Sequence, residues 1–310
     1  MKLVLISGCA ILSMLVASGA MAQSTSTVSE SLPASDRADG VTLSTSTAPK
    51  SRWQMALSSE NSTGALDQKV LGSKAPVVST NAAGLVYTLN PLWAVELREY
   101  FEYASNAEAL TGRTAQMHEK AMESGPTLLR LAAKPTWGIA GSKPLTAEFR
   151  YYLPNDRVSR ENKEAGLLRA DAYAEWMMSP RYSFAFWASP RVLLNTAQNP
   201  NAIRGADAEY YEMKLAPFAN YYFNDNVNAY VAYTLSGRST GAQRGHWIPD
   251  AGNVGSPELG MFWVAGAFTV NPALTSDTNL NSADGSILTR NSRVFAEETL
   301  SYNFNLYATF

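Results

Sequence analysis

The chain has 310 residues, a formal net charge of −2 and 17% charged side chains. A charge balance this close to zero gives no electrostatic footprint for nucleic acid, and an apolar fraction of 46% excludes a disordered chain. Beyond residue 22 no stretch is apolar over the roughly 20 residues that a membrane helix needs. Two classes remain, a soluble β-rich domain and a transmembrane β-barrel.

The first 22 residues are typical of a targeting segment. Lys2 gives a short basic start, residues 3–16 are apolar, and Ala20 and Ala22 offer small side chains at the positions that a signal peptidase recognises. We therefore expect a secretory signal peptide over residues 1–22, cleaved before Gln23. The only cysteine of the chain, Cys9, lies within it, so the exported part is expected to contain no disulfide.

Residues 23–50 are rich in Ser, Thr and Ala and contain no aromatic residue. Such a segment buries too little apolar surface to offset the entropy lost on ordering, which predicts a flexible periplasmic leader. The folded domain is then expected over residues 51–310.

From residue 52 onward the dominant period of apolar residues is two. Leu145–Leu153 alternates Leu, Ala, Phe, Tyr and Leu with Thr, Glu, Arg and Tyr, and Val227–Ser236 follows the same pattern. Since alternate side chains of a strand lie on opposite faces, each such segment has an apolar and a polar face. A bulge is expected near residues 141–144. The predicted strands are 52–59, 82–89, 93–103, 125–134, 137–153, 166–178, 182–194, 208–222, 227–236, 256–270, 273–282 and 291–310.

Short turns are predicted where a proline is followed two residues later by a large apolar side chain. This pattern occurs in Asn90–Trp93, Lys134–Trp137, Ser179–Tyr182 and Asn271–Leu274. The turns recur roughly every 45 residues, and Phe223–Asn226 fills the one double interval. The connections between them are longer and polar. Short turns at one end and long loops at the other are the asymmetry of bacterial outer-membrane barrels.

The last segment, Leu300–Phe310, alternates apolar and polar residues and ends on Phe310. It resembles the closing strand of bacterial outer-membrane β-barrel proteins, and with the signal peptide it extends the resemblance over residues 52–310. The resemblance implies an all-β fold, a transmembrane antiparallel up-and-down barrel of about twelve strands with short periplasmic turns and long extracellular loops. It also implies contact with outer-membrane lipid and lipopolysaccharide, and recognition of Phe310 by the barrel-assembly machinery. The alternative is a soluble exported β-sandwich.

Three aromatic residues, Trp93, Trp137 and Tyr182, directly follow predicted short turns. Amphipathic rings prefer the membrane–water interface, so we expect these residues to belong to an aromatic girdle at the periplasmic edge. In a soluble sandwich they would instead be core residues beside turns.

If the apolar faces meet lipid, the other faces line the interior. One cation then comes from each of six consecutive strands, with carboxylates beside them. Two interpretations stay open, a charged constriction that selects ions and solutes, or a salt-bridge network that fills the lumen. The predicted pore-lining residues are Glu96, Arg98, Arg130, Glu148, Arg150, Arg169, Asp171, Glu175, Arg191, Glu212 and Lys214.

Barrels of this size in the resembled family include channels for small or anionic solutes. The resemblance therefore implies a porin-like channel for passive diffusion of small hydrophilic solutes, anionic ones included, with no enzymatic step, cofactor or metal. The sequence does not indicate an oligomeric state.

An outer-membrane rim enzyme acting on lipid or peptide is the alternative, and a closed structural or adhesive barrel is a third. The two histidines, His118 and His246, fall in predicted outer loops, where Ser236 or Ser239 could act as a nucleophile with Asp250. The chain has neither a nucleophile elbow nor a zinc-binding helix motif. Four residues with side-chain oxygens are also considered as a calcium site: Asp277, Asn279, Asn281 and Asp284. They lack the glutamate that completes a calcium-binding loop.

Overall fold

The computed structural model describes residues 52–63, 77–104, 122–195, 209–240, 254–276, 278–279 and 300–310. The signal peptide predicted over residues 1–22 and the leader predicted over residues 23–50 lie outside these residues, and both stay predictions.

The described residues form twelve long strands and a two-residue strand, β12 (Thr278–Asn279), which pairs with β10 beyond the end of β11. The all-β fold and the number of strands are confirmed. The long strands are β1 (Trp53–Thr63), β2 (Val77–Asn90), β3 (Trp93–Ala104), β4 (Met122–Ala133), β5 (Thr146–Leu153), β6 (Glu164–Met177), β7 (Tyr182–Asn195), β8 (Glu209–Asn224), β9 (Val227–Thr240), β10 (Val254–Ala265), β11 (Phe268–Ser276) and β13 (Leu300–Thr309).

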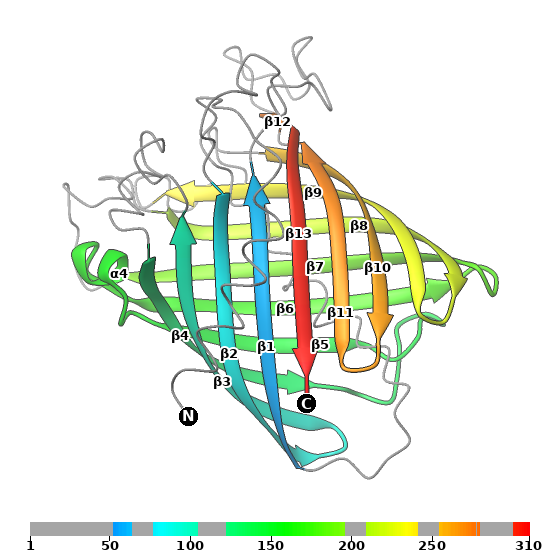
Figure 1. The fold of residues 1–310 in the computed structure, drawn as a ribbon, viewed down its shortest axis with the longest axis horizontal. Coiled ribbons are helices and arrows are strands. Elements are labelled where there is room, and N and C mark those ends of the chain that lie inside the picture. Colours follow the sequence, from blue (N-terminus) through cyan, green and yellow to red (C-terminus); the bar gives the residue numbers. More distant parts are fainter. Residues whose placement is uncertain are drawn as a thin grey trace.

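The sheet closes on itself. Each strand from β1 to β10 pairs antiparallel with the next one along the chain, and β13 lies between β11 and β1 (Figure 1). At the seam, Met55 N donates to Phe310 O over 3.1 Å and Phe310 N donates to Met55 O over 3.0 Å. A closed sheet leaves no edge of unpaired backbone groups, which is the condition for a sheet to cross a bilayer.

The predicted alternation separates the two faces of the barrel. On β3, Glu96, Arg98 and Tyr100 are buried, whereas Leu97 between them is 54% exposed. The same outward exposure of large apolar side chains occurs at Phe149 (56%) and around the barrel as far as Trp263. An outer surface that is apolar over most of the barrel, around a charged interior, is stable against acyl chains and not against water, so the barrel is a transmembrane one.

Two of the predicted short turns share one hydrogen-bond geometry. The side chain of Asn90 accepts from Leu92 N over 2.9 Å, and that of Asn224 accepts from Asn226 N over 2.9 Å. An asparagine that satisfies the amide two residues on fixes a tight reversal. In the Ser179–Tyr182 turn, Tyr182 N donates to Ser179 O over 3.3 Å. These three turns are confirmed.

The turn predicted over Asn271–Leu274 is wrong, because these residues lie inside β11. Asn271 pairs with Asn305 and Pro272 with Phe304 across the seam, and the reversal occurs earlier, at Gly266, whose φ is +63°. The predicted strands 256–270 and 273–282 shift accordingly. An Asn-Pro dipeptide is a strong local turn signal, but here pairing with a strand on each side outweighs it.

The predicted strand 137–153 is also wrong in its first half. Residues 134–145 form an irregular connection, and β5 begins only at Thr146. Ala140 and Gly141 have φ values of +46° and +80°, and Lys143 N donates to Glu175 O over 2.7 Å. Lys134–Trp137 is therefore the start of a longer connection and not a tight turn.

The connection between β5 and β6 contains a short helix, α4 (Arg157–Glu161), capped by Asp156, whose side chain accepts from Ser159 N over 2.9 Å. No helix among the described residues is long and apolar enough to cross a membrane.

The close contact between Tyr230 and Gly260 allows the packing of the inner wall to be tested. Tyr230 on β9 faces Gly260 on β10, where an added Cβ would lie 2.4 Å from the tyrosine ring. We expect Gly260→Ala to destabilise the barrel by about 1–3 kcal/mol, because the ring must move. The measurement is urea unfolding followed by the loss of the fast-migrating folded band on an unboiled detergent gel.

The matched control is the same substitution in a Tyr230→Ala background, where the clashing ring is gone and the added methyl should cost little. An equal cost of Gly260→Ala in both backgrounds would contradict this explanation.

Candidate functional site

A row of arginines crosses the inner wall of the barrel. Arg130 on β4, Arg150 on β5, Arg169 on β6 and Arg191 on β7 are direct cross-strand partners of one another. We call these four residues the arginine row. Like charges placed opposite each other on adjacent strands repel, so the row requires compensation by anions on the same face.

Carboxylates two residues away along the strands supply that compensation, because side chains at i and i+2 share a face of the sheet. Arg98 Nε lies 2.7 Å from Glu96 Oε1, and Arg130 Nη1 lies 2.7 Å from Glu96 Oε2. One carboxylate thus joins an arginine of its own strand to an arginine of the next strand.

The same arrangement continues through the middle of the row. Glu148 accepts from Arg130 and also from Arg150 Nη2, the latter over 2.6 Å. Arg150 Nε lies 3.4 Å from Asp171 Oδ2, and Arg169 Nη2 lies 2.7 Å from Asp171 Oδ1. Cations and carboxylates therefore alternate without interruption from β3 to β6.

A buried serine and a fourth carboxylate, Glu212, complete the arrangement at β7 and β8. Ser189 Oγ accepts from Arg169 Nε over 3.1 Å and from Arg191 Nε over 3.5 Å. Arg191 Nη1 lies 3.4 Å from Glu212 Oε2, and Lys214 Nζ lies 3.5 Å from Glu212 Oε1. We call the whole assembly, the arginine row with Arg98, Lys214, Glu96, Glu148, Asp171 and Glu212, the charge ladder.

The ladder brings together all but one of the residues predicted to line the pore. The exception is Glu175, near the short-turn end of β6, which accepts from Lys143 Nζ over 2.9 Å and from the Tyr222 hydroxyl over 2.5 Å. Nearly all the ladder side chains are buried, and Arg150 is 2% exposed. Their assignment as pore-lining groups stays a prediction.

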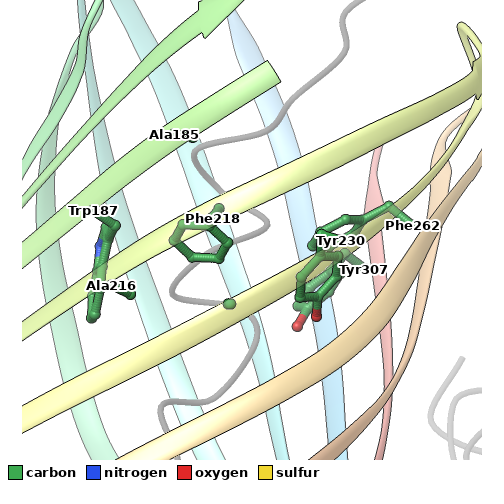
Figure 2. Packing of buried hydrophobic residues seen from close by; sticks show 8 residues of the cluster. Ala185, Trp187, Ala216, Phe218, Tyr230, Phe262 and Tyr307 are labelled. Carbon is green, nitrogen blue, oxygen red and sulfur yellow. The ribbon is translucent and has the colours of Figure 1, made fainter. Parts of the chain in front are cut away.

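The rest of the inner wall, from β7 to β10 and β13, carries aromatic rings that the sequence analysis did not single out. Figure 2 shows Trp187, Phe218, Tyr230, Phe262 and Tyr307 projecting from the strands beside small alanines. The rings of Tyr230 and Phe262 stack with centroids 5.0 Å apart. The guanidinium of Arg169 lies 5.9 Å from the centre of the Trp187 ring, so the aromatic wall and the charge ladder are in contact.

A polar network at the seam was also missed. The Tyr230 hydroxyl donates to Glu258 Oε1 over 2.5 Å and accepts from Asn271 Nδ2 over 3.1 Å, while Asn305 Nδ2 donates to Asn271 Oδ1 over 3.3 Å. The parity of β10 would have placed Glu258 on the inner face with Ser256 and Phe262. Asn271 was hidden by the wrong turn prediction.

Of the residues considered for a rim enzyme, Ser236 is described, and it is not at the rim. Its hydroxyl donates to Glu212 Oε1 over 3.0 Å inside the barrel. His118, His246 and Asp250, and the side chain of Ser239, lie outside the described residues, as do the side chains considered for calcium, Asp277, Asn279, Asn281 and Asp284.

Two of the predicted girdle residues, Trp93 and Tyr182, begin strands at the short-turn end and point outward. Trp137 lies in the irregular connection at the same end and is 62% exposed. Other outward rings pair at this end, Trp53 with Tyr87 and Phe268 with Phe310. Their role as interface anchors stays a prediction.

No protein-family model matches the chain, and no curated protein is significantly similar to it. Among solved structures, a NanC porin is 6% identical with a TM-score of 0.46, covering 83% of this chain and 98% of its own. A KdgM porin in complex with disordered oligogalacturonate is 7% identical with a TM-score of 0.43, covering 83% and 99%. OmpT, an outer membrane protein of Vibrio cholerae, is 10% identical with a TM-score of 0.36, covering 86% and 100%.

Likenesses at these TM-scores add nothing to the assignment, which rests on the barrel itself. A closed antiparallel sheet with an apolar exterior, a charged interior and short turns at one end is the architecture of bacterial outer-membrane proteins. The chain therefore forms a closed transmembrane β-barrel of the outer-membrane type.

The centre of the charge ladder provides a stability test. Arg150→Ala leaves Glu148 and Asp171 buried with one arginine fewer, so we expect a loss of about 3–5 kcal/mol. The measurement is urea unfolding of the purified barrel. Lys143→Ala is the control, because the Lys143 side chain is 42% exposed and its pair with Glu175 should contribute under about 1 kcal/mol. Equal losses would show that burial does not set the strength of the ladder.

Proposed function

We propose that this barrel is a porin-like channel through which small hydrophilic solutes cross the outer membrane by diffusion. The observation that carries the proposal is the charge ladder, an inner wall of ionised groups enclosed by an apolar, closed sheet. If the interior served only to fill the barrel, apolar side chains of similar volume would do so without the free-energy cost of removing charged groups from water. A wall of ionised groups is instead suited to a path for ions and polar solutes.

The ion pairs of the ladder also hold its charged groups in fixed positions, which matters for the proposed channel. Each of its carboxylates is bound by cations from its own or a neighbouring strand, so the guanidinium groups are held in place. A rigid row keeps its positive potential fixed along the wall of the channel. In this proposal the ladder is the fixed scaffold of the path and not a moving gate.

The composition of the ladder favours anionic solutes. Its six cations face four carboxylates, a surplus of two positive charges along β3–β8. Glu175 does not change this surplus, since Lys143 neutralises it. Two further carboxylates face the interior outside the ladder, Glu60 on β1 and Glu258 on β10, so the surplus is local to the ladder. Because charge on a pore wall enriches nearby counter-ions, we propose a preference for small anions along the ladder.

The remaining partners of the proposal follow from the membrane location. Trp93, Trp137 and Tyr182 would rest at the periplasmic interface, and lipopolysaccharide would surround the outer half of the barrel. Phe310, which ends the closing strand against Met55, would be the residue read by the barrel-assembly machinery.

The channel is tested by recording single-molecule conductance in a planar bilayer. The purified protein should produce stepwise currents, and a reversal potential in a potassium chloride gradient that reports anion preference. The double variant Arg98→Gln with Lys214→Gln removes both surplus cations while Glu96 keeps Arg130 and Glu212 keeps Arg191. We expect its reversal potential to move toward cation preference, because the ladder becomes neutral.

Arg181→Gln is the matched control, since Arg181 is an exposed cation in a short turn outside the lumen and should leave the reversal potential unchanged. A protein that resists unfolding until boiled yet gives no conductance steps would overturn the channel. An unmoved reversal potential in the double variant would overturn only the anion preference.

A further inference from the structure

The outer face of β1 and β2 carries a group of polar side chains where other strands carry apolar ones. Ser59 pairs directly with Asn81, and Asn61 with Ser79, and all four are on the outward parity of their strands. We call these four residues the outer polar block. Below it, toward the short-turn end, the same face returns to the usual pattern, with Met55 opposite Leu85.

The outer polar block lies at the height of the apolar band and not above it. In the same rows, β13 on one side presents Leu306 and Phe304, and β3 on the other side presents Phe101 and Tyr103. Phe304 is 40% exposed, as expected of a side chain that meets lipid. Since apolar side chains flank the block on both sides, the block faces the same depth of the bilayer as they do.

Hydrogen bonds within the block satisfy its amide protons. Asn61 Nδ2 donates to Ser59 Oγ over 3.2 Å and to Phe304 O over 3.0 Å, and Asn81 Nδ2 donates to Ser79 Oγ over 3.0 Å. Within the described part of the chain, neither Asn61 Oδ1 nor Asn81 Oδ1 has a donor. Facing acyl chains, such acceptors would be left unsatisfied at a cost of the order of 1–3 kcal/mol each.

A carboxylate one row closer to the short turns extends this polar surface. Glu99, exposed on the outer face of β3, faces Ala83 on β2 and accepts the Thr127 hydroxyl over 2.5 Å. An ionised group on the lipid face is destabilising in a membrane barrel. Asn155 of the β5–β6 connection also bonds Thr127, so Glu99 lies near the long-loop end of the barrel, beside the outer polar block.

The charge and the hydrogen-bonding groups of the block indicate which kind of partner it suits. It contains no cation, so it does not suit the phosphates of lipopolysaccharide. It does contain both halves of a hydrogen bond, since the Ser59 hydroxyl can donate while Asn61 Oδ1 and Asn81 Oδ1 can accept; Ser79 is only 8% exposed and is not counted among the available groups. Such a surface complements a copy of itself related by a two-fold axis.

We propose that the β1–β2 wall is a dimer interface, at which two copies of this chain join their outer polar blocks within the membrane. Figure 1 shows β13, β1, β2 and β3 side by side on one wall, with β6–β9 across the barrel. The far wall can then keep its apolar outward residues, such as Phe186 and Val231, against lipid. Polar side chains often join transmembrane segments in this way.

Disulfide cross-linking in native membranes tests the proposal. In a Cys9→Ser background, which removes the only cysteine, Asn81→Cys should form a covalent homodimer of twice the monomer mass on oxidation. Val231→Cys is the control, because it is an outward, 57% exposed position on the opposite wall and should stay monomeric. Equal cross-linking of the two variants, or a cross-link of Asn81→Cys to a different protein, would overturn the proposal.

A second variant tests the same wall without cysteine. Asn61→Leu with Asn81→Leu makes the block apolar, and we expect it to weaken dimerisation in detergent by about tenfold or more, as read by native mass spectrometry. Its folded band on an unboiled gel should persist, since apolar side chains suit the lipid face. A wild-type protein that is monomeric at every concentration would overturn the proposal. Conductance is independent of this result.

Discussion

Closure of the sheet is the constraint on which the rest of this molecule depends. A backbone inside a bilayer has no water to bond, so the strand that ends at Phe310 must be held on both sides, by β11 and by β1. Once the ring is closed, each strand has a lipid face and an interior face with no exchange between them. A slip of one residue in any strand would turn its charged set toward lipid, as it would for Arg150 and Glu148 on β5.

The charge ladder and the strand register support each other. Pairs separated by one residue, Glu96 with Arg98 and Glu148 with Arg150, place both charges on one face of a strand, and the neighbouring strand then adds its arginine beside them. Because each carboxylate bridges two cations, a shift in register would break several ion pairs at once. The ladder therefore specifies the alignment of β3–β8 in addition to any part it plays in solute passage.

The alternation of apolar and polar residues was sufficient to predict which side chains of a strand face the interior. Alternation alone gives the parity of each strand, and parity placed residues such as Arg169 and Lys214 inside. Prediction from sequence failed where pairing with neighbouring strands determines the structure. Asn271-Pro272 has the local signature of a turn, yet pairing of both residues with β13, and of the flanking Val270 and Ala273 with β10, keeps it extended. The aromatic wall and the Tyr230–Glu258 bond join strands distant in the chain, and no spacing within one strand indicates them.

The first two strands, β1 and β2, are longer in the structure than the sequence pattern predicted. From sequence they were expected to cover only 52–59 and 82–89, with a long polar connection between them over about residues 60–81. The structure continues β1 to Thr63 and begins β2 at Val77, with unbroken pairing through the polar segment. The backbone there is as well paired as elsewhere, so the polar outer face is not the frayed end of a strand. A wall that keeps its sheet and gives up its apolar side chains is consistent with a protein neighbour at that place instead of lipid.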